Sequence, residues 1–170
     1  MHILIATDAD WIVDDITAAL GSDDTSFTIC RDGRVVAREV AAKTPDLAVF
    51  DLQIGSMGGM AVTMSLRLDE SVGVLPRVRV LMLLDRSADL HLARRCGADG
   101  WLIKPLDPLR LRRAAEAILA GARYTEGLAA ESIEVLIAEC VRHRRGTDLV
   151  CVEDRQHPSR CLVATHAASC

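Results

Sequence analysis

Short apolar runs alternate along the chain with stretches in which apolar residues recur at helical spacing. The apolar runs predict five β-strands, at residues 2–6, 26–30, 47–50, 78–84 and 100–103. The helical stretches predict helices at residues 11–20, 33–43, 60–70, 88–96 and 108–120. Apolar strands that alternate with helices are typical of a parallel sheet covered on both faces. The pattern therefore predicts an α/β fold with a doubly wound, five-stranded parallel sheet.

Residue types that begin or end helices support several of these boundaries. Asp107 is a suitable N-cap, because its carboxylate can accept hydrogen bonds from free backbone amides, and Pro108 suits the first helical position. Gly21, Gly97 and Gly121 each follow an expected helix and are suitable residues to end it. The alternation of strands and helices is therefore supported by a second, independent signal.

Candidate acids and bases of a site follow the first, third, fourth and fifth expected strands. Asp8 and Asp10 follow the first strand, Asp51 the third, Asp85 the fourth and Lys104 the fifth. In doubly wound sheets the functional crevice lies at the carboxyl ends of the strands, where the strand order reverses. In the flavodoxin-like order 2-1-3-4-5, strands one, three and five end close together, so Asp8, Asp51 and Lys104 are expected to converge.

Asp51 ends an apolar run, residues 47–50, and leads directly into a glycine-containing bend. A buried charge without a partner is costly, so this carboxylate needs compensation. Lys104 offers an ammonium group, and Asp8 offers a second carboxylate that would help Asp51 hold a divalent cation. The sequence therefore predicts a charged pocket at this edge of the sheet.

Length and composition narrow the class of protein. The chain has 170 residues, of which 50% are hydrophobic, so it has room for one domain and a tail. Its net charge of -4 argues against non-specific binding to nucleic acid or to an anionic membrane. Neither a secretory signal nor a membrane-spanning segment is recognised, so we expect a cytoplasmic protein with its six cysteines reduced.

Residues 1 to about 122 resemble the receiver domain of two-component response regulators. The stretches that carry the resemblance, in the family's order and spacing, are ILIATDAD, PDLAVFDLQIGSMGGM, VRVLMLLD and GADGWLIKPLDPLRL. The resemblance implies that Asp51 accepts a phosphoryl group from a sensor histidine kinase or another phosphodonor. It also implies that Mg²⁺ is held by Asp8, by Asp51 and by the backbone carbonyl of Gln53. Lys104 would pair with the phosphoryl oxygens, and Trp101 occupies the family's aromatic switch position.

Three departures from the family's pattern predict an atypical member. The loop after Asp51 has Gly55 and Gly58 in place of the family's Pro and acidic-Gly pair. The family usually has two adjacent acids after the first strand, whereas Thr7 stands here where the first is expected and only Asp8 remains. The fourth strand of the family ends on Ser or Thr, whereas residues 82–84 are Met, Leu and Leu. We therefore expect weaker metal binding and weaker coupling between the pocket and Trp101.

Two other functions remain open from the residues alone. The chain could be a pseudo-receiver, an interaction module that keeps the Asp51–Lys104 pair without being phosphorylated. The DAD stretch also resembles the nucleophile motif of haloacid-dehalogenase phosphatases, with Asp8 as nucleophile and Asp10 as acid and base. The residues after the lysine, PLDPLRL, lack the acidic cluster that such a magnesium-dependent phosphatase needs. A non-enzymatic signalling role is therefore the preferred interpretation.

Residues 123–170 form a separate extension in this interpretation. Helical periodicity predicts a helix at about 128–145, followed by a hairpin or a loose tail. The extension has six basic and seven acidic residues, which does not favour a DNA-binding output domain. We therefore expect a stand-alone receiver that acts on a downstream protein partner, with a possible homodimer. Cys140 and His143 have metal-ligand spacing, but the thiols downstream match no zinc module.

Overall fold

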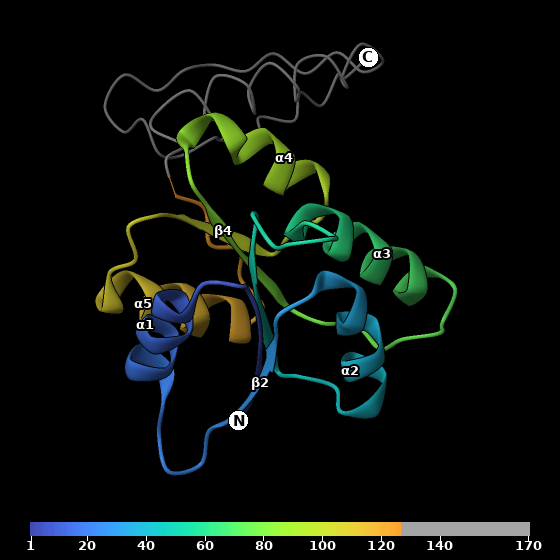
Figure 1. The fold of residues 1–170 in the computed structure, drawn as a ribbon, viewed down its shortest axis with the longest axis horizontal. Helices are drawn as coiled ribbons and strands as arrows, with labels where there is room; N and C mark the ends of the chain where they lie inside the picture. Colours follow the sequence, from blue (N-terminus) through green and yellow to red (C-terminus); the bar gives the residue numbers. More distant parts are fainter. Residues whose placement is uncertain (127–170) are drawn as a thin grey trace, which may run out of the picture. The chain divides into compact units, whose positions relative to one another are not determined.

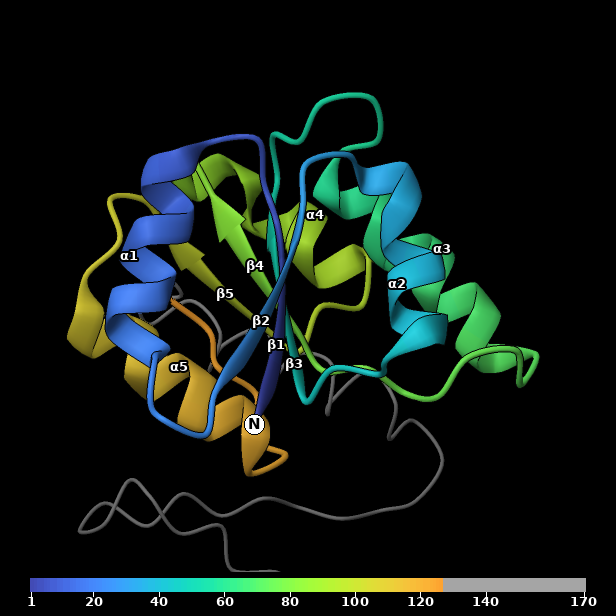
Figure 2. The same ribbon diagram turned by 60° about the horizontal axis from the view of Figure 1, so that its bottom comes forward.

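The computed structural model describes residues 1–126, which contain a parallel sheet with two helical layers (Figures 1 and 2). The five strands are β1 His2–Ala6, β2 Ser26–Cys30, β3 Leu47–Asp51, β4 Val80–Leu84 and β5 Gly100–Ile103. Their order is β2-β1-β3-β4-β5, and every neighbouring pair is parallel. The predicted fold class and strand order are therefore confirmed for the described part of the chain.

The helices are α1 Asp10–Leu20, α2 Val36–Ala42, α3 Gly59–Ser71, α4 Leu90–Arg95 and α5 Pro108–Leu119. Figure 2 shows α1 and α5 on one face of the sheet and α2, α3 and α4 on the other. Each strand except β2 is buried along its length, and alternate side chains contribute to two separate apolar clusters. Phe50 and Met82 pack toward α2, α3 and α4, whereas Ile5 and Leu83 pack toward α1 and α5. This two-sided burial explains why the strands are apolar throughout.

Three predicted boundaries need correction, and local hydrogen bonds give the reason for two of them. The expected helix 33–43 begins with a 3₁₀ turn, Gly33–Val35, because the Asp32 side chain accepts a hydrogen bond from the Arg34 amide. The expected helix 88–96 also begins with a 3₁₀ turn, Ser87–Asp89. The fourth strand begins at Val80 rather than at residue 78, because the Val78 amide donates to the Glu70 carboxylate.

The expected helix signals are present in the described residues. Asp107 caps α5 by accepting hydrogen bonds from the amides of Leu109 and Arg110. Gly97 and Gly121 follow helices with φ angles of 81° and 83°, a conformation that favours glycine. Gly21 caps α1 with extended backbone instead.

The tail predictions concern a different part of the chain. The helix expected at 128–145, the following hairpin or tail, and the candidate metal ligands Cys140 and His143 lie outside the described residues. Within residues 1–126, no helix combines the length and apolarity needed to cross a bilayer.

Candidate functional site

Asp51 is the last residue of β3, and its side chain is only 3% exposed. One carboxylate oxygen, Oδ1, accepts hydrogen bonds from Lys104 Nζ at 2.7 Å and from the Gln53 amide at 3.2 Å. The other oxygen, Oδ2, accepts a hydrogen bond from the Thr7 hydroxyl at 3.0 Å. The buried charge is therefore compensated by one cation and two neutral donors, as the burial of a carboxylate requires.

Lys104 follows β5 and connects two carboxylates. Its Nζ atom lies 2.7 Å from Asp51 Oδ1 and 3.0 Å from Asp85 Oδ1. Desolvation by burial lowers the pKa of Lys104, but hydrogen bonds and the charges of Asp51 and Asp85 outweigh it, so the pKa is raised. The ammonium also lies 5.8 Å from the ring centroid of Trp11, which is half exposed on α1. Lys104 therefore remains a cation at neutral pH.

Asp8 lies beside this pair rather than in contact with it. Ala6 pairs with Phe50 in the β1–β3 ladder, so Thr7 and Asp8 leave the sheet at the same edge as Asp51. Asp8 is exposed, and its Oδ2 atom lies 3.7 Å from the position that a Cβ on Gly55 would occupy. The structure thus joins Asp51 to Lys104 directly, while Asp8 stands at the solvent side of the same edge.

The oxygen atoms at this edge fit a hard cation with few protein ligands. Asp8 and Asp51 supply carboxylates and Gln53 a backbone carbonyl, and Mg²⁺ typically keeps several waters in addition. Thr7 has no charge and donates a hydrogen bond to Asp51 Oδ2. Within residues 1–126, no cluster of three or more Asp, Glu, His or Cys residues is arranged to hold a metal. The donor set therefore suits magnesium, but with less negative charge than an acid pair would provide.

Leucines occupy the end of β4 next to the site. Leu83 pairs with Asp51 in the sheet, and both Leu83 and Leu84 are buried. Because both residues are leucines, neither side chain offers a hydroxyl to the site. Trp101 on β5 is buried, and its indole Nε1 donates to the backbone carbonyl of Glu126 at 2.9 Å.

Sequence reasoning noted Asp85 as an acid that follows a strand but gave it no role. It gave no role to Glu126, whose carboxylate accepts a hydrogen bond from the amide of Ile103, the residue before Lys104. The position of Asp85 after a strand was an available signal for its contact with Lys104. For Glu126 the only signal was its charge, which does not identify a partner.

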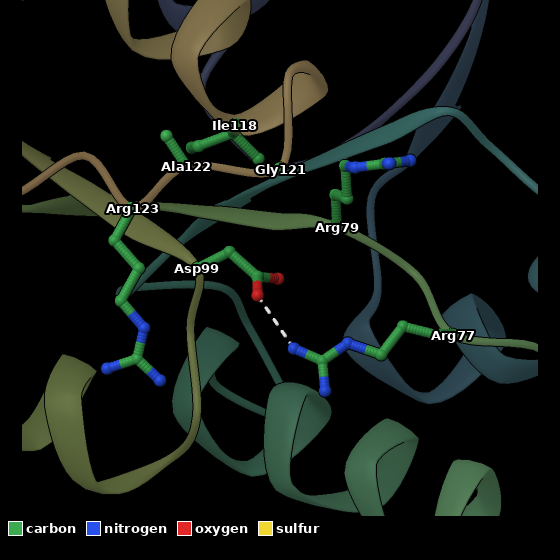
Figure 3. Close-up of a pocket in the computed structure, with 7 residues that line it drawn as sticks. All are labelled: Arg77, Arg79, Asp99, Ile118, Gly121, Ala122 and Arg123. Atoms are coloured by element: carbon green, nitrogen blue, oxygen red, sulfur yellow. Dashed lines mark hydrogen bonds and ion pairs between the residues drawn. The ribbon is translucent and has the colours of Figure 1, made fainter.

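A separate cavity of about 430 Å³ lies at the opposite end of β4 and β5 (Figure 3). Its lining residues are Arg77, Arg79, Asp99, Ile118, Gly121, Ala122 and Arg123. Arg77 Nη2 forms an ion pair with Asp99 Oδ1 at 2.7 Å, while Figure 3 shows the side chains of Arg79 and Arg123 pointing away from each other. This cavity does not contain the Asp51 site.

Comparison with known proteins gives relatives that regulate transcription. The chain is 31% identical over 137 residues to the transcriptional regulatory protein CseB of Streptomyces coelicolor, covering 76% of this chain and 56% of that protein. It is 27% identical to the DNA-binding response regulator MtrA of Mycolicibacterium smegmatis, covering 79% and 56% respectively. The chain thus spans about half the length of these curated relatives.

Solved structures show the same fold. A two-component response regulator of the LuxR family from Aurantimonas sp. matches with a TM-score of 0.63 and 26% identity, covering 83% of this chain and 97% of that one. The chemotaxis response regulator CheY4 of Vibrio cholerae matches with a TM-score of 0.60 and 20% identity, covering 69% and 97%. The family model described as the response regulator receiver domain matches residues 3–116. The chain therefore belongs to the response regulator receiver domain family, a signalling module of two-component systems.

Proposed function

We propose that this receiver domain accepts a phosphoryl group on Asp51 from the phosphohistidine of a sensor kinase or from another phosphodonor. The observation that supports this most directly is the buried carboxylate of Asp51 with Lys104 Nζ at 2.7 Å. In the transfer, a carboxylate oxygen of Asp51 forms a bond to phosphorus, the P–N bond of the donor breaks, and the imidazole leaves and takes up a proton. Phosphoryl transfer depends mainly on positioning and electrostatic stabilisation, and Lys104 supplies a fixed positive charge.

Magnesium has defined candidate ligands in this proposal. Receiver domains typically bind Mg²⁺, and here Asp8, Asp51 and the backbone carbonyl of Gln53 would hold it. When bound, the cation supplies positive charge that offsets the charge of the transferred group. Thr7 keeps Asp51 Oδ2 hydrogen-bonded, and the Gln53 amide orients Oδ1. The protein thereby holds the carboxylate in one orientation before the donor arrives.

Intact-mass measurement after incubation with acetyl phosphate and Mg²⁺ tests the proposal. We expect the parent protein to gain the mass of one phosphoryl group and Asp51→Asn to gain none. The absence of any gain in the parent protein would instead support a phosphorylation-independent pseudo-receiver. A gain that persists in Asp51→Asn and disappears in Asp8→Asn would support the phosphatase alternative, with Asp8 as nucleophile.

The output of the domain is proposed to be protein contact. The names of the curated relatives describe transcriptional and DNA-binding regulators, but the matched region is about half of their length. The described residues comprise the five strands and five helices of the receiver fold with two 3₁₀ turns. A downstream protein or a second copy of the chain is the proposed partner. Light scattering with and without beryllofluoride and Mg²⁺ tests the second copy. If the measured mass stays that of a monomer when beryllofluoride and Mg²⁺ are added, a second copy of the chain is excluded and a different protein is the proposed partner.

A further inference from the structure

The segment after α5 closes the outer edge of the sheet. β5 is an edge strand, so its outward amides and carbonyls have no neighbouring strand of the sheet. Tyr124 pairs with Gly100 in a parallel bridge: its carbonyl accepts from the Trp101 amide at 3.0 Å, and its amide donates to Asp99. A Cβ on Gly100 would lie 2.7 Å from the Tyr124 carbonyl, so this contact depends on glycine. The chain that leaves α5 is therefore held against β5.

Glu126 continues this contact with its side chain. Its Oε2 atom accepts a hydrogen bond from the Ile103 amide at 3.0 Å, and its backbone carbonyl accepts from Trp101 Nε1. Arg110 on α5 binds the same carboxylate, with Nε 2.6 Å from Oε1 and Nη2 in contact with Oε2. Desolvation raises the pKa of Glu126, but the hydrogen bonds from Arg110 and Ile103 outweigh it and hold the pKa below its usual value. The Glu126 carboxylate is thus ionised, and both of its oxygens accept hydrogen bonds.

Arg110 also binds the backbone on both sides of Lys104. Its Nη2 atom donates to the Ile103 carbonyl at 3.0 Å, and its Nη1 atom donates to the Pro105 carbonyl at 3.2 Å. Together with the Glu126 bond to the Ile103 amide, three contacts therefore hold the backbone of Ile103 and Pro105, the residues on either side of Lys104. The orientation of Lys104 toward Asp51 depends on this backbone.

We propose that Glu126 and Arg110 form a clasp that positions Lys104 against Asp51, so that the segment leaving α5 controls the cation of the site. Both are positioning residues, because they touch the backbone around Lys104 and not the reacting atoms. The effect on phosphoryl transfer rests on the proposed function, whereas the effect on Lys104 itself does not.

The composition of the chain makes a direct test possible, because Lys43 and Lys104 are its only lysines. Trace labelling with acetic anhydride, followed by peptide mapping, gives the reactivity of Lys104 relative to Lys43, which is exposed. In Glu126→Ala we expect the relative reactivity of Lys104 to rise about 10-fold, since charge-assisted hydrogen bonds are lost. The pH midpoint of Lys104 labelling should also fall toward the ordinary lysine value of 10.5, which a purely structural role would not cause.

Glu116→Ala is the matched control, because Glu116 is an exposed acid on α5 whose side chain forms no hydrogen bond or ion pair within residues 1–126. It should leave Lys104 labelling unchanged. Arg110→Ala and the Arg110→Ala/Glu126→Ala double variant should match Glu126→Ala, since the two residues act as one unit. If an alanine variant does not fold, Glu126→Gln replaces it, with a smaller rise expected in the same direction.

Unchanged Lys104 labelling and an unchanged midpoint in a folded Glu126 variant would overturn the clasp. The rate of phosphoryl uptake from acetyl phosphate, measured on the same variants, separates the two proposals. If the parent protein takes up no phosphoryl group, the proposed function fails and the labelling result still decides the clasp. If the parent is phosphorylated and labelling rises in Glu126→Ala, a slower uptake in that variant supports both proposals.

Discussion

At the scale of single residues, the site is organised by how each oxygen of Asp51 is satisfied. Lys104 provides the only side-chain cation in contact with Asp51 among the described residues, and Thr7 provides a neutral donor. The Thr7 hydroxyl also accepts a hydrogen bond from the Ala9 amide at 3.2 Å, so its proton is directed to Asp51. Thr7 therefore stabilises the Asp51 carboxylate by hydrogen bonding, whereas an acid at this position would repel Asp51 and attract a cation.

Replacing Thr7 with Asp is predicted to strengthen magnesium binding. The added carboxylate supplies charge close to the proposed ligands, and we expect the affinity for Mg²⁺ to rise about 10-fold, as judged from the effect of residues around metal sites. Titration with Mg²⁺ followed by Trp11 fluorescence measures this, because Trp11 lies at the site beside Lys104. Thr7→Ser keeps the hydroxyl and serves as control. An unchanged affinity in Thr7→Asp would argue against a cation at this edge.

Loss of the ammonium group is predicted to destabilise the domain. Lys104→Met leaves the carboxylate of Asp51 buried without its cation, so the free energy of unfolding should fall by about 3–5 kcal/mol. Urea denaturation measures the change. Adding Asp51→Asn to Lys104→Met should recover most of the loss, because the amide carries no charge. Failure of the double variant to recover stability would show that packing, rather than charge, causes the effect.

The raised pKa of Lys104 predicts a pH dependence in the alkaline range. A basic group whose pKa is raised on folding stabilises the native state below its ordinary value of 10.5, and this contribution is lost as pH rises through the higher folded value. We expect the melting temperature of the wild type to fall from about pH 10.5 upward, more steeply than that of Asp51→Asn/Lys104→Met. Parallel curves for the two proteins would contradict this assignment.

Position after a strand was sufficient to predict that Asp51 and Lys104 share one edge of the sheet, because parallel strands bring their carboxyl ends together. It also led to the expectation that Asp8 converges with them, whereas Asp8 is exposed beside the pair. This reasoning placed Asp51 and Lys104 on the same edge before any contact was known. It could not predict that Asp85 shares Lys104, because the conformation of the loop after β4 decides that contact. Nor could it predict the Arg110–Glu126 pair, which forms only when the chain turns back along β5 after α5.

At the scale of elements, the close approach of α3 to β3 sets the position of Asp51. Gly59 begins α3, and a Cβ at this residue would lie only 2.3 Å from the Asp51 carbonyl oxygen. Periodicity predicted a helix from residue 60, but it could not show that the helix starts against the strand that carries the acid. Apolar periodicity also could not predict the 3₁₀ turn after Asp32, because a side-chain hydrogen bond starts that turn.

Gly59→Ala is therefore predicted to destabilise the domain by about 1–3 kcal/mol, the usual cost of overpacking. The added methyl group meets rigid backbone, which outweighs the better helix propensity of alanine. Gly55→Ala, in the loop between β3 and α3, is the matched control, since its Cβ would lie 3.7 Å from Asp8 Oδ2, an ordinary contact. Chemical denaturation of both variants measures the difference. Equal stability of the two would show that α3 can move away from β3 without loss.

At the scale of the whole domain, one sheet separates two apolar layers, and two buried cysteines lie in the same layer. Cys30 ends β2, one edge of the sheet, and Cys96 follows α4 near the other edge. Burial is the main cause that raises the pKa of both thiols, for Cys30 to about 11. Both should therefore react slowly with alkylating reagents in the folded protein, because the thiolate is the reactive form. The alkylation rates of Cys30 and Cys96 therefore measure local opening at opposite edges of the sheet.

If the described domain unfolds as one cooperative unit, Cys30 and Cys96 should become reactive together. Iodoacetamide labelling at increasing urea, followed by peptide mapping, should give the same midpoint for both residues and the same free energy of opening. The shared sheet gives the reason, since β1, β3 and β4 connect the two edges through continuous backbone ladders. An earlier midpoint for Cys96 would mean that α4 and β5 open separately. In Glu126→Ala, which removes contacts along β5, the Cys96 midpoint should move to lower urea first.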